Sequence, residues 1–261
     1  MAILLYSLIL YLLLPVAVLR LGWRGLRNPA YWRRWSERFG YAPLMQQAGC
    51  IWLHAVSVGE TRAAVPLVRA LQQHYPGRRI LITSMTPTGS DQVRELFGKQ
   101  VEHCYVPYDL PRAVRRFLNR TRPALAIIME TELWPNLFHQ CHRRGIPLML
   151  ANVRMSEKSA RGYRRFAGFT RATLANVSHV GAQTGDDAER LRALGATRVE
   201  VTGSIKFEMD VPADIAAQAA ALRSGFGDRP VWVAASTRVG EEEFVLDAFT
   251  HLRERLPRLL L

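Results

Sequence analysis

The stretch IWLHAVSVGE, residues 51–60, decides the fold of this chain. Its first six residues, Ile51–Val56, form a short apolar run that a helical pattern follows, which is typical of a strand buried on both faces of a parallel sheet. Glu60 then lies just past the carboxyl end of that strand, where open α/β sheets bind ligands. The spacing Ser57-x-x-Glu60 also fits a capping box. Glu60 is therefore either a helix cap or a catalytic carboxylate.

Apolar runs and amphipathic stretches alternate along the following residues at the spacing of βαβ units. The predicted strands are Ile51–Val56, Ile80–Ser84, Val101–Val106, Leu125–Met129, Pro147–Asn152, Val180–Gln183 and Val199–Thr202. The helical patterns between them are 61–74, 88–97, 111–119, 134–144, 158–175 and 185–194. Right-handed crossovers then predict an α/β fold with a doubly wound, Rossmann-like parallel sheet. Pro66 predicts that the first helix is kinked or starts late.

The pattern changes at Gly203, where the stretch 203–212 is typical of a linker. After it we expect a helix over 213–223, a strand over 231–235, a turn over 236–240, a helix over 241–255 and the start of a strand at 259–261. These elements are too few to complete a parallel sheet. We therefore expect an anchor over residues 1–22, a first Rossmann-like domain over 23–210, and only the beginning of a second over 211–261.

The first residues predict a membrane anchor. Residues 2–19 are uncharged and about long enough to span a bilayer as a helix. A cleaved signal peptide is disfavoured because the positive amino-terminal region and a small-residue cleavage site are both missing. The residues that follow are rich in arginine and tryptophan: Arg20, Trp23, Arg24, Arg27, Trp32, Arg33, Arg34, Trp35 and Arg38. They predict a single-pass anchor with the rest of the chain in the cytoplasm, while Pro15 leaves open a helix that lies on an anionic membrane.

Composition narrows the classes of partner and cofactor. The 261 residues are 49% hydrophobic, enough for a sizeable core, and the net charge of +13 indicates an anionic partner. Nucleic acid, an anionic membrane and a phosphorylated substrate all fit that charge, and the apolar first segment favours the membrane. The three cysteines form no C-x-x-C pair and are expected to be small core residues. Because no dinucleotide, P-loop or zinc pattern occurs, we expect no cofactor and no metal.

Further carboxylates follow the strand Leu125–Met129. Glu130 and Glu132 lie at its carboxyl end and share the sheet edge with Glu60. Two or three carboxylates around one crevice suit general acid–base chemistry on sugars. A structural interpretation stands beside this one, in which either residue caps the helix that begins near Trp134.

Two basic features and one loop are also open to two interpretations. Lys206 falls where the first domain meets the second and either stabilises developing negative charge or is merely solvated. The basic run 154–165 either binds the phosphates of a substrate or is a solvated helix face. The loop 86–91 precedes a predicted helix, and we favour a plain amino-terminal cap there over an anion site.

Seven ordered motifs together resemble the 3-deoxy-D-manno-octulosonic acid (Kdo) transferases of lipopolysaccharide assembly. They are SVGE at 57–60, TPTGS at 86–90, PYDLP at 107–111, METELWPN at 129–136, Arg154-x-Ser-x-x-Ser159, TGSIKF at 202–207 and Ser236-Thr237 followed by GEE at 240–242. The resemblance runs from the anchor to the last residue. It implies an inverting glycosyltransferase of the GT-B type that moves Kdo from CMP-Kdo to the lipid A precursor (lipid IVA) without a metal ion.

The resemblance also implies roles for particular residues. Glu60 matches the general base, and Glu130 and Lys206 match positions that stabilise the transition state. Candidate acceptor-binding residues are Ser57, Gly59, Arg154, Ser156 and Arg161, and candidate donor-binding residues are Ser236 and Thr237. The implied partners are CMP-Kdo, the lipid A precursor and the anionic bacterial inner membrane, with the catalytic domains on its cytoplasmic side and no nucleic acid.

Two positions depart from the family pattern, and two other functions stay open. Arg238 stands where histidine is common, and Glu208 stands where aspartate is common. One alternative is a membrane-bound glycoside hydrolase that uses Glu60 with Glu130 or Glu132. The other is a non-catalytic lipid-binding fragment, because most of the donor-binding half is expected to lie beyond residue 261.

Overall fold

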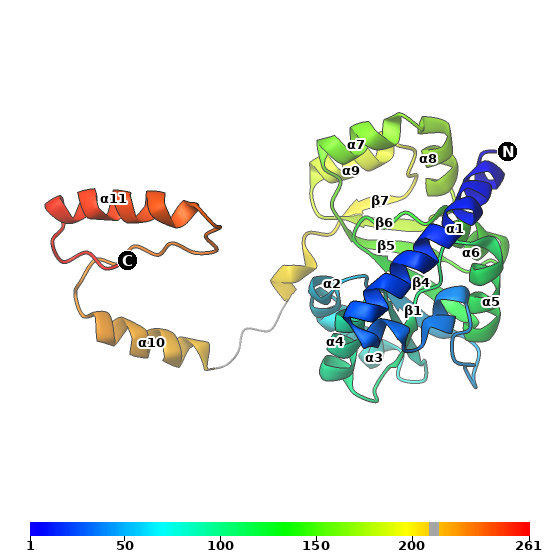
Figure 1. Cartoon of the computed structure of the whole chain (residues 1–261), viewed down its shortest axis with the longest axis horizontal. Coiled ribbons are helices and arrows are strands. Elements are labelled where there is room, and N and C mark those ends of the chain that lie inside the picture. The colour runs from blue at the N-terminus through cyan, green and yellow to red at the C-terminus, as the bar shows by residue number, and fades with distance from the viewer. Residues whose placement is uncertain (209–213) are drawn as a thin grey trace. The chain divides into compact units, whose positions relative to one another are not determined.

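The structure is a computed structural model that describes residues 1–208 and 214–261. The chain forms two compact units, Met1–Met209 and Asp210–Leu261 (Figure 1). The predicted boundary between residues 210 and 211 lies outside the described residues.

A seven-stranded parallel sheet forms the centre of the first unit. Its strands are β1 (Cys50–His54), β2 (Ile80–Ser84), β3 (Glu102–Tyr105), β4 (Pro123–Met129), β5 (Leu148–Val153), β6 (His179–Ala182) and β7 (Val199–Val201). Their order is β3-β2-β1-β4-β5-β6-β7, so the direction of winding reverses between β1 and β4. The predicted doubly wound sheet is confirmed, and its topological switch point lies between these two strands.

Eight helices connect these strands, two more than the sequence patterns predict. They are α2 (Val58–Ala63), α3 (Val65–His74), α4 (Pro87–Phe97), α5 (Pro111–Thr121), α6 (Pro135–Arg143), α7 (Glu157–Arg164), α8 (Ala167–Leu174) and α9 (Gly185–Ala193). The predicted helix 61–74 breaks at Ala64 because Pro66 is accommodated in the first turn of a new helix, α3. A single helix over 158–175 is wrong: tight turns at Arg165 and Phe166 separate α7 from α8.

Both faces of the sheet are buried. All five residues of β1 are buried, and its alternate side chains enter two different clusters, as a strand with period two requires. Trp52 packs on Phe117 on one face, with ring centroids 4.8 Å apart, whereas Leu53 joins Val68 on the other. The three cysteines are buried and free, as their spacing predicts.

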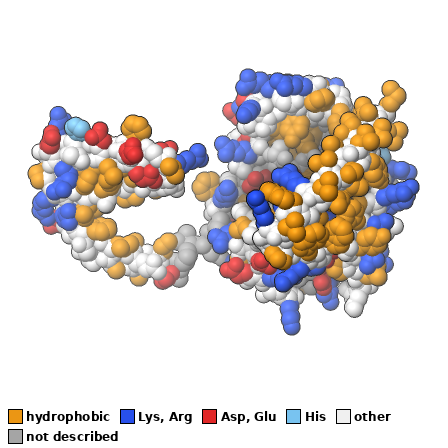
Figure 2. Space-filling model, in the orientation of Figure 1, with side chains coloured by type: hydrophobic (Ala, Val, Ile, Leu, Met, Phe, Trp, Pro, Cys, Tyr) orange, Lys and Arg blue, Asp and Glu red, His pale blue; other side chains and the backbone are white. Residues whose placement is uncertain are grey.

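The apolar first segment forms one helix, α1 (Ala2–Arg27), which ends five residues after the predicted anchor 1–22 and has Pro15 inside it. It is long and apolar enough to cross a membrane. Figure 2 shows its hydrophobic side chains gathered in a band on the surface of the first unit. The short helices η1 (Pro29–Trp32) and η2 (Trp35–Phe39) follow and lead into the sheet.

The end of the first unit and the second unit differ in part from expectation. The predicted linker begins as a short helix, η3 (Ile205–Glu208), and its later residues lie outside the described ones. The second unit contains α10 (Ile215–Phe226) and α11 (Glu241–Arg255), neither of which buries a residue. The predicted strands 231–235 and 259–261 are wrong, since only a single parallel bridge joins Val231 to Leu260. A strand needs a ladder of partners, and one bridge does not supply it.

Candidate active site at the switch point of the sheet

Glu60 lies in the first turn of α2, directly after β1. Its carboxylate accepts hydrogen bonds from the amide of Val56 (2.8 Å) and the hydroxyl of Ser57 (2.9 Å). The Ser57 oxygen in turn accepts a hydrogen bond from the Glu60 amide (3.2 Å). The predicted capping geometry is present with one difference: Glu60 bonds to the amide of Val56, whereas a standard capping box would use the amide of the cap residue Ser57. Capping therefore fixes the position of the carboxylate and leaves its chemistry open.

Burial raises the pKa of Glu60 above its ordinary value of 4.5, since the side chain is enclosed at the sheet edge. The hydrogen bonds from Val56 and Ser57 favour the ionised form and oppose this rise. Repulsion from Glu130 and Glu132 adds to it. The three carboxylates that the sequence places at one edge thus act on one another electrostatically. A carboxylate with a raised pKa in such a crevice is equipped to accept a proton.

Glu130 is the first residue after β4, across the switch point from β1. Its backbone adopts the left-handed conformation, with a φ of 57°, and its amide donates to the carbonyl of Ala151 (2.8 Å). Residues other than glycine rarely adopt the left-handed backbone conformation, which costs them about 1–2 kcal/mol. This left-handed residue turns the chain sharply at the carboxyl end of β4. Within residues 1–208 and 214–261, the Glu130 carboxylate has no hydrogen-bond partner.

Glu132 lies in the same turn, and its carboxylate accepts a hydrogen bond from the indole nitrogen of Trp134 (3.0 Å). Burial raises the pKa of Glu132, the Trp134 hydrogen bond opposes that rise, and Glu130 adds to it. The Trp134 ring meets the buried His54 ring edge to face, with centroids 5.7 Å apart. The end of β1 and the turn after β4 are thus in direct contact. The predicted alternative that Glu130 or Glu132 caps α6 is wrong, because the amides of its first turn donate to Asp109 instead.

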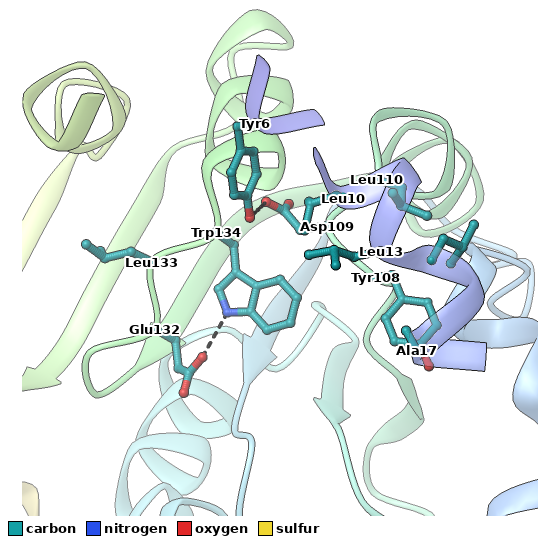
Figure 3. Close-up of a pocket in the computed structure, with 11 residues that line it drawn as sticks. Tyr6, Leu10, Leu13, Ala17, Tyr108, Asp109, Leu110, Glu132, Leu133 and Trp134 are labelled. Carbon is teal, nitrogen blue, oxygen red and sulfur yellow. Dashed lines mark hydrogen bonds between the residues drawn. The ribbon is translucent and has the colours of Figure 1, made fainter. Parts of the chain in front are cut away.

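A buried aspartate that sequence reasoning missed, Asp109, holds the end of this turn (Figure 3). Its carboxylate accepts hydrogen bonds from the amides of Asn136 (3.0 Å) and Leu137 (2.8 Å), and from the hydroxyl of Tyr6 in α1 (3.0 Å). Ser7 donates to the side chain of Asn136 (2.9 Å). Burial raises the pKa of Asp109 to about 7 against the effect of these donors. The motif 107–111 could have signalled this role, and its proximity to α1 could not be read from the sequence.

An apolar cavity of about 360 Å³ lies between α1 and the turn after β4. Figure 3 shows Leu10 and Leu13 of α1 on one side of it and Leu133 and Trp134 on the other. Glu132 is among its lining residues. The apolar face of α1 therefore reaches the same edge of the sheet as the carboxylates.

The structure places Lys206 in η3, where its side chain is exposed. The preceding residue, Ile205, packs on the core cluster that includes Met129 and Ala151. The Ile205 amide donates to the side chain of Asn152 (3.1 Å), a buried residue with a left-handed φ of 59° at the end of β5. Asn152 thus fixes the start of the segment that carries Lys206 beside the carboxyl end of β4. The sequence patterns gave no sign of this contact.

The predicted acceptor residues lie near the same edge, at exposed positions. Ser57 and Gly59 belong to the turn that carries Glu60. The carbonyl of Arg154 accepts a hydrogen bond from Thr131 (2.5 Å), which joins the basic stretch to the turn after β4. Ser156 is the amino-terminal cap of α7, and its hydroxyl oxygen accepts a hydrogen bond from the amide of Ser159 (3.1 Å). Arg161 lies within α7 and is exposed.

The remaining predicted positions fall into two groups. Thr86 caps α4 through the amide of Gly89 (3.1 Å), so the plain cap is confirmed. Ser236 and Thr237 lie in the second unit, both exposed, and Ser236 has a left-handed φ of 59°. Among the described residues there is no group of three or more His, Cys, Asp or Glu side chains placed to hold a metal ion.

A Rossmann-like sheet whose switch point gathers three glutamates defines the first unit as an α/β domain of the GT-B type. The fold resembles that of UDP-GlcNAc 2-epimerase from Neisseria meningitidis bound to UDP-GlcNAc, with a TM-score of 0.54 and 15% identity. That likeness covers 80% of this chain and 63% of the epimerase. At this identity it shows the fold alone.

The chain belongs to the 3-deoxy-D-manno-octulosonic-acid transferase (Kdo transferase) family, whose profile matches residues 33–209. It is 39% identical to a 3-deoxy-D-manno-octulosonic acid transferase of Haemophilus influenzae, over 98% of this chain and 61% of the relative. It is 37% identical to the enzyme of the same name from Bordetella pertussis, over 98% of this chain and 62% of the relative. The chain thus spans about three fifths of the length of these relatives.

Proposed function

We propose that the full natural protein that carries this chain is an inverting glycosyltransferase that moves Kdo from CMP-Kdo to the lipid A precursor. The observation that carries the proposal is Glu60, a buried carboxylate with a raised pKa at the switch point of a GT-B-type sheet. Membership of the Kdo transferase family supports the sugar and the class of reaction.

In this reaction Glu60 is the general base. It accepts the proton of the attacking acceptor hydroxyl while that oxygen bonds to the anomeric carbon of Kdo. The bond from that carbon to the phosphate oxygen breaks, and CMP leaves with the electron pair. Attack on the face opposite CMP inverts the configuration. The raised pKa makes Glu60 a stronger base than a solvated glutamate, while it stays ionised above that pKa.

Two other residues stabilise the charges that develop. Glu130 faces the positive charge that builds up on the sugar ring in an oxocarbenium-like transition state. Lys206 stabilises the negative charge on the departing phosphate, a role in which a cationic side chain can replace a metal ion. The bond from Ile205 to Asn152 supports this placement of the Lys206 segment.

The remaining assignments concern location and substrate binding. Helix α1 anchors the protein in the bacterial inner membrane, with the catalytic units on the cytoplasmic side. Arg154, Ser156 and Arg161 contribute to acceptor binding, and Ser236 and Thr237 contribute to binding of CMP-Kdo. Their exposure at the first unit's basic surface and in the second unit is compatible with these roles.

The test is an assay of membranes that contain the full natural protein with CMP-Kdo and the lipid A precursor. We expect a Kdo-lipid product by mass spectrometry, formed only when the nucleotide donor is present. A folded protein that yields no such product would contradict the proposal. Sugar release without the nucleotide donor would instead favour a hydrolase that uses the clustered carboxylates.

A further inference from the structure

A second cavity, of about 460 Å³, lies between α1 and the ends of β1 and β2. We call it the arginine cavity, because Arg20, Arg24 and Arg38 line it. Its other lining residues include Val56 and Thr86. Val56 is the residue whose amide holds the Glu60 carboxylate, so the arginine cavity adjoins the proposed base.

Arg38 is the unusual member of this group, because it is only 4% exposed. One of its terminal nitrogens donates to the carbonyl of Met85 (2.9 Å), and its guanidinium lies 4.4 Å from the centre of the Tyr105 ring. Its Nε has no hydrogen-bond partner in the part of the chain that the structure describes. A buried guanidinium is costly unless an anion and hydrogen-bond acceptors compensate its charge.

The nearest candidate for that anion is already used. Glu37 precedes Arg38, but its two carboxylate oxygens accept hydrogen bonds from the Arg34 side chain (2.8 Å) and the Tyr105 amide (2.8 Å). No other carboxylate among residues 1–208 and 214–261 lies within 4.0 Å of the Arg38 nitrogens. Arg38 therefore has an uncompensated positive charge at the wall of the cavity that it lines.

The walls of the cavity indicate what kind of ligand this is. Three arginines suit a phosphate group, to which guanidinium groups donate paired hydrogen bonds. Helix α1, which carries Arg20 and Arg24, also lines the cavity with the apolar side chains of Leu13, Val16 and Ala17. This apolar surface continues into the band of exposed hydrophobic side chains in Figure 2. A cavity with arginines for a phosphate group and an adjoining apolar surface for acyl chains suits a phosphorylated amphiphile.

We infer that the arginine cavity is a binding site for a phosphate monoester on an acylated amphiphile, which places the ligand's head group next to Glu60. The inference rests on the proposed function only where it takes this ligand to be the acceptor. Binding itself can be measured without donor or turnover, so a failed transfer assay and a failed binding assay are distinguishable.

The test titrates the detergent-purified chain with dioctanoyl phosphatidic acid below its micellar concentration. Dioctanoylglycerol, which lacks the phosphate, and inorganic phosphate, which lacks the chains, are the comparison ligands. We expect the phosphatidic acid to bind at least about tenfold more tightly than either. Equal affinity for dioctanoylglycerol or for inorganic phosphate would overturn the inference, since the first needs no arginines and the second needs no apolar wall.

Paired variants locate the binding. Arg24→Gln should lower the affinity for dioctanoyl phosphatidic acid about tenfold, through loss of one charged donor. Arg27→Gln is the matched control, because Arg27 is on the same helix, stacks on Trp23 and lies outside the cavity lining. It should keep the wild-type affinity. Equal losses in both variants would assign the binding to general surface charge and contradict the inference.

Arg38→Lys tests the buried position itself. It keeps a positive charge but removes the Nε donor and the planar fork, so we expect an affinity loss at least as large as that of Arg24→Gln. The melting temperature is measured in parallel. If Arg38→Lys folds and binds as tightly as wild type, Arg38 does not hold the ligand; if it unfolds, the Arg24 and Arg27 pair still decides.

Discussion

The turns after β1 and β4 each place a glutamate at the switch point, but they hold it by different means. The Glu60 carboxylate is fixed by hydrogen bonds from its own turn, the Val56 amide and the Ser57 hydroxyl. Glu130 is fixed through its backbone, which is left-handed and bonded to Ala151. Hydrogen bonds to the carboxylate of Glu60 change its pKa directly. Glu130 is held by its backbone instead, which leaves its carboxylate free to interact with a ligand.

The largest effect that this comparison predicts is at Glu60. Glutamine can still accept the hydrogen bond from the Val56 amide with its one oxygen and donate its NH2 group to the Ser57 oxygen, but it cannot take up a proton. In the full natural protein we therefore expect Glu60→Gln to lower kcat roughly a hundredfold or more, since this is the usual contribution of a general base. The melting temperature should stay close to that of wild type, and both substrates should still bind.

The control is Glu95→Gln, which removes a carboxylate on the exposed side of α4, away from the switch point. It should keep wild-type turnover. Turnover by Glu60→Gln close to that of wild type would remove Glu60 from the mechanism and leave its turn with a capping role only.

A second prediction concerns what holds the turn after β4. Asp109→Ala removes an acceptor from the amides of Asn136 and Leu137 and from the Tyr6 hydroxyl. We expect the free energy of unfolding to fall by about 2–3 kcal/mol, because buried donors lose their partner. Tyr6→Phe, which breaks only the bond to α1, should cost about 1 kcal/mol. Equal costs in chemical denaturation would show that the bonds within the turn contribute nothing.

The pKa of Asp109 adds a dependence on pH. Its folded value of about 7 lies above the ordinary value of 3.8, so its contribution to stability is fully present below pH 3.8 and is lost as the pH rises through about 7. The destabilisation of Asp109→Ala relative to wild type should therefore be larger at pH 5 than at pH 8. A difference of the opposite sign would contradict this account of the buried carboxyl.

The smallest stability effect is expected at Glu130. Glycine adopts the left-handed conformation without strain, and alanine does not. Glu130→Gly should therefore be about 1 kcal/mol more stable than Glu130→Ala, although both lose the carboxylate and should lose turnover to a similar extent. Equal stability of the two variants in thermal unfolding would mean that the strained turn is not maintained in solution.

The sequence predicts the fold of the first unit well because its strands are unambiguous. The run Ile51–Val56 is apolar at successive positions, and Pro66 marks the start of a helix. The break between α7 and α8 was missed since no proline or apolar interruption marks it. The predicted strand 231–235 failed for another reason: its residues have strand propensity but almost no partner strand in the described second unit.

The candidate site was predictable only where a side chain carries the signal. The pattern Ser57-x-x-Glu60 predicts the hydrogen bonds between these two residues. Glu60 and Glu130 share one edge of the sheet because they follow the neighbouring strands β1 and β4. The left-handed backbone of Glu130 has no sequence signature, because glutamate is not a residue that favours it. The contacts of Asp109 with Tyr6 and of Asn152 with Ile205 join residues far apart in the chain, so that spacing could not reveal them.

The most direct test of the central claim is the pH dependence of kcat/KM in the full natural protein and in its Ser57→Ala variant. Glu60 must be ionised to accept a proton, so kcat/KM should fall as the pH is lowered through its pKa, which burial places above 4.5. Ser57→Ala removes a hydrogen bond that lowers this pKa, and the acid limb should move to higher pH. An acid limb that does not move on loss of the Ser57 hydroxyl would contradict the assignment of Glu60 as the base.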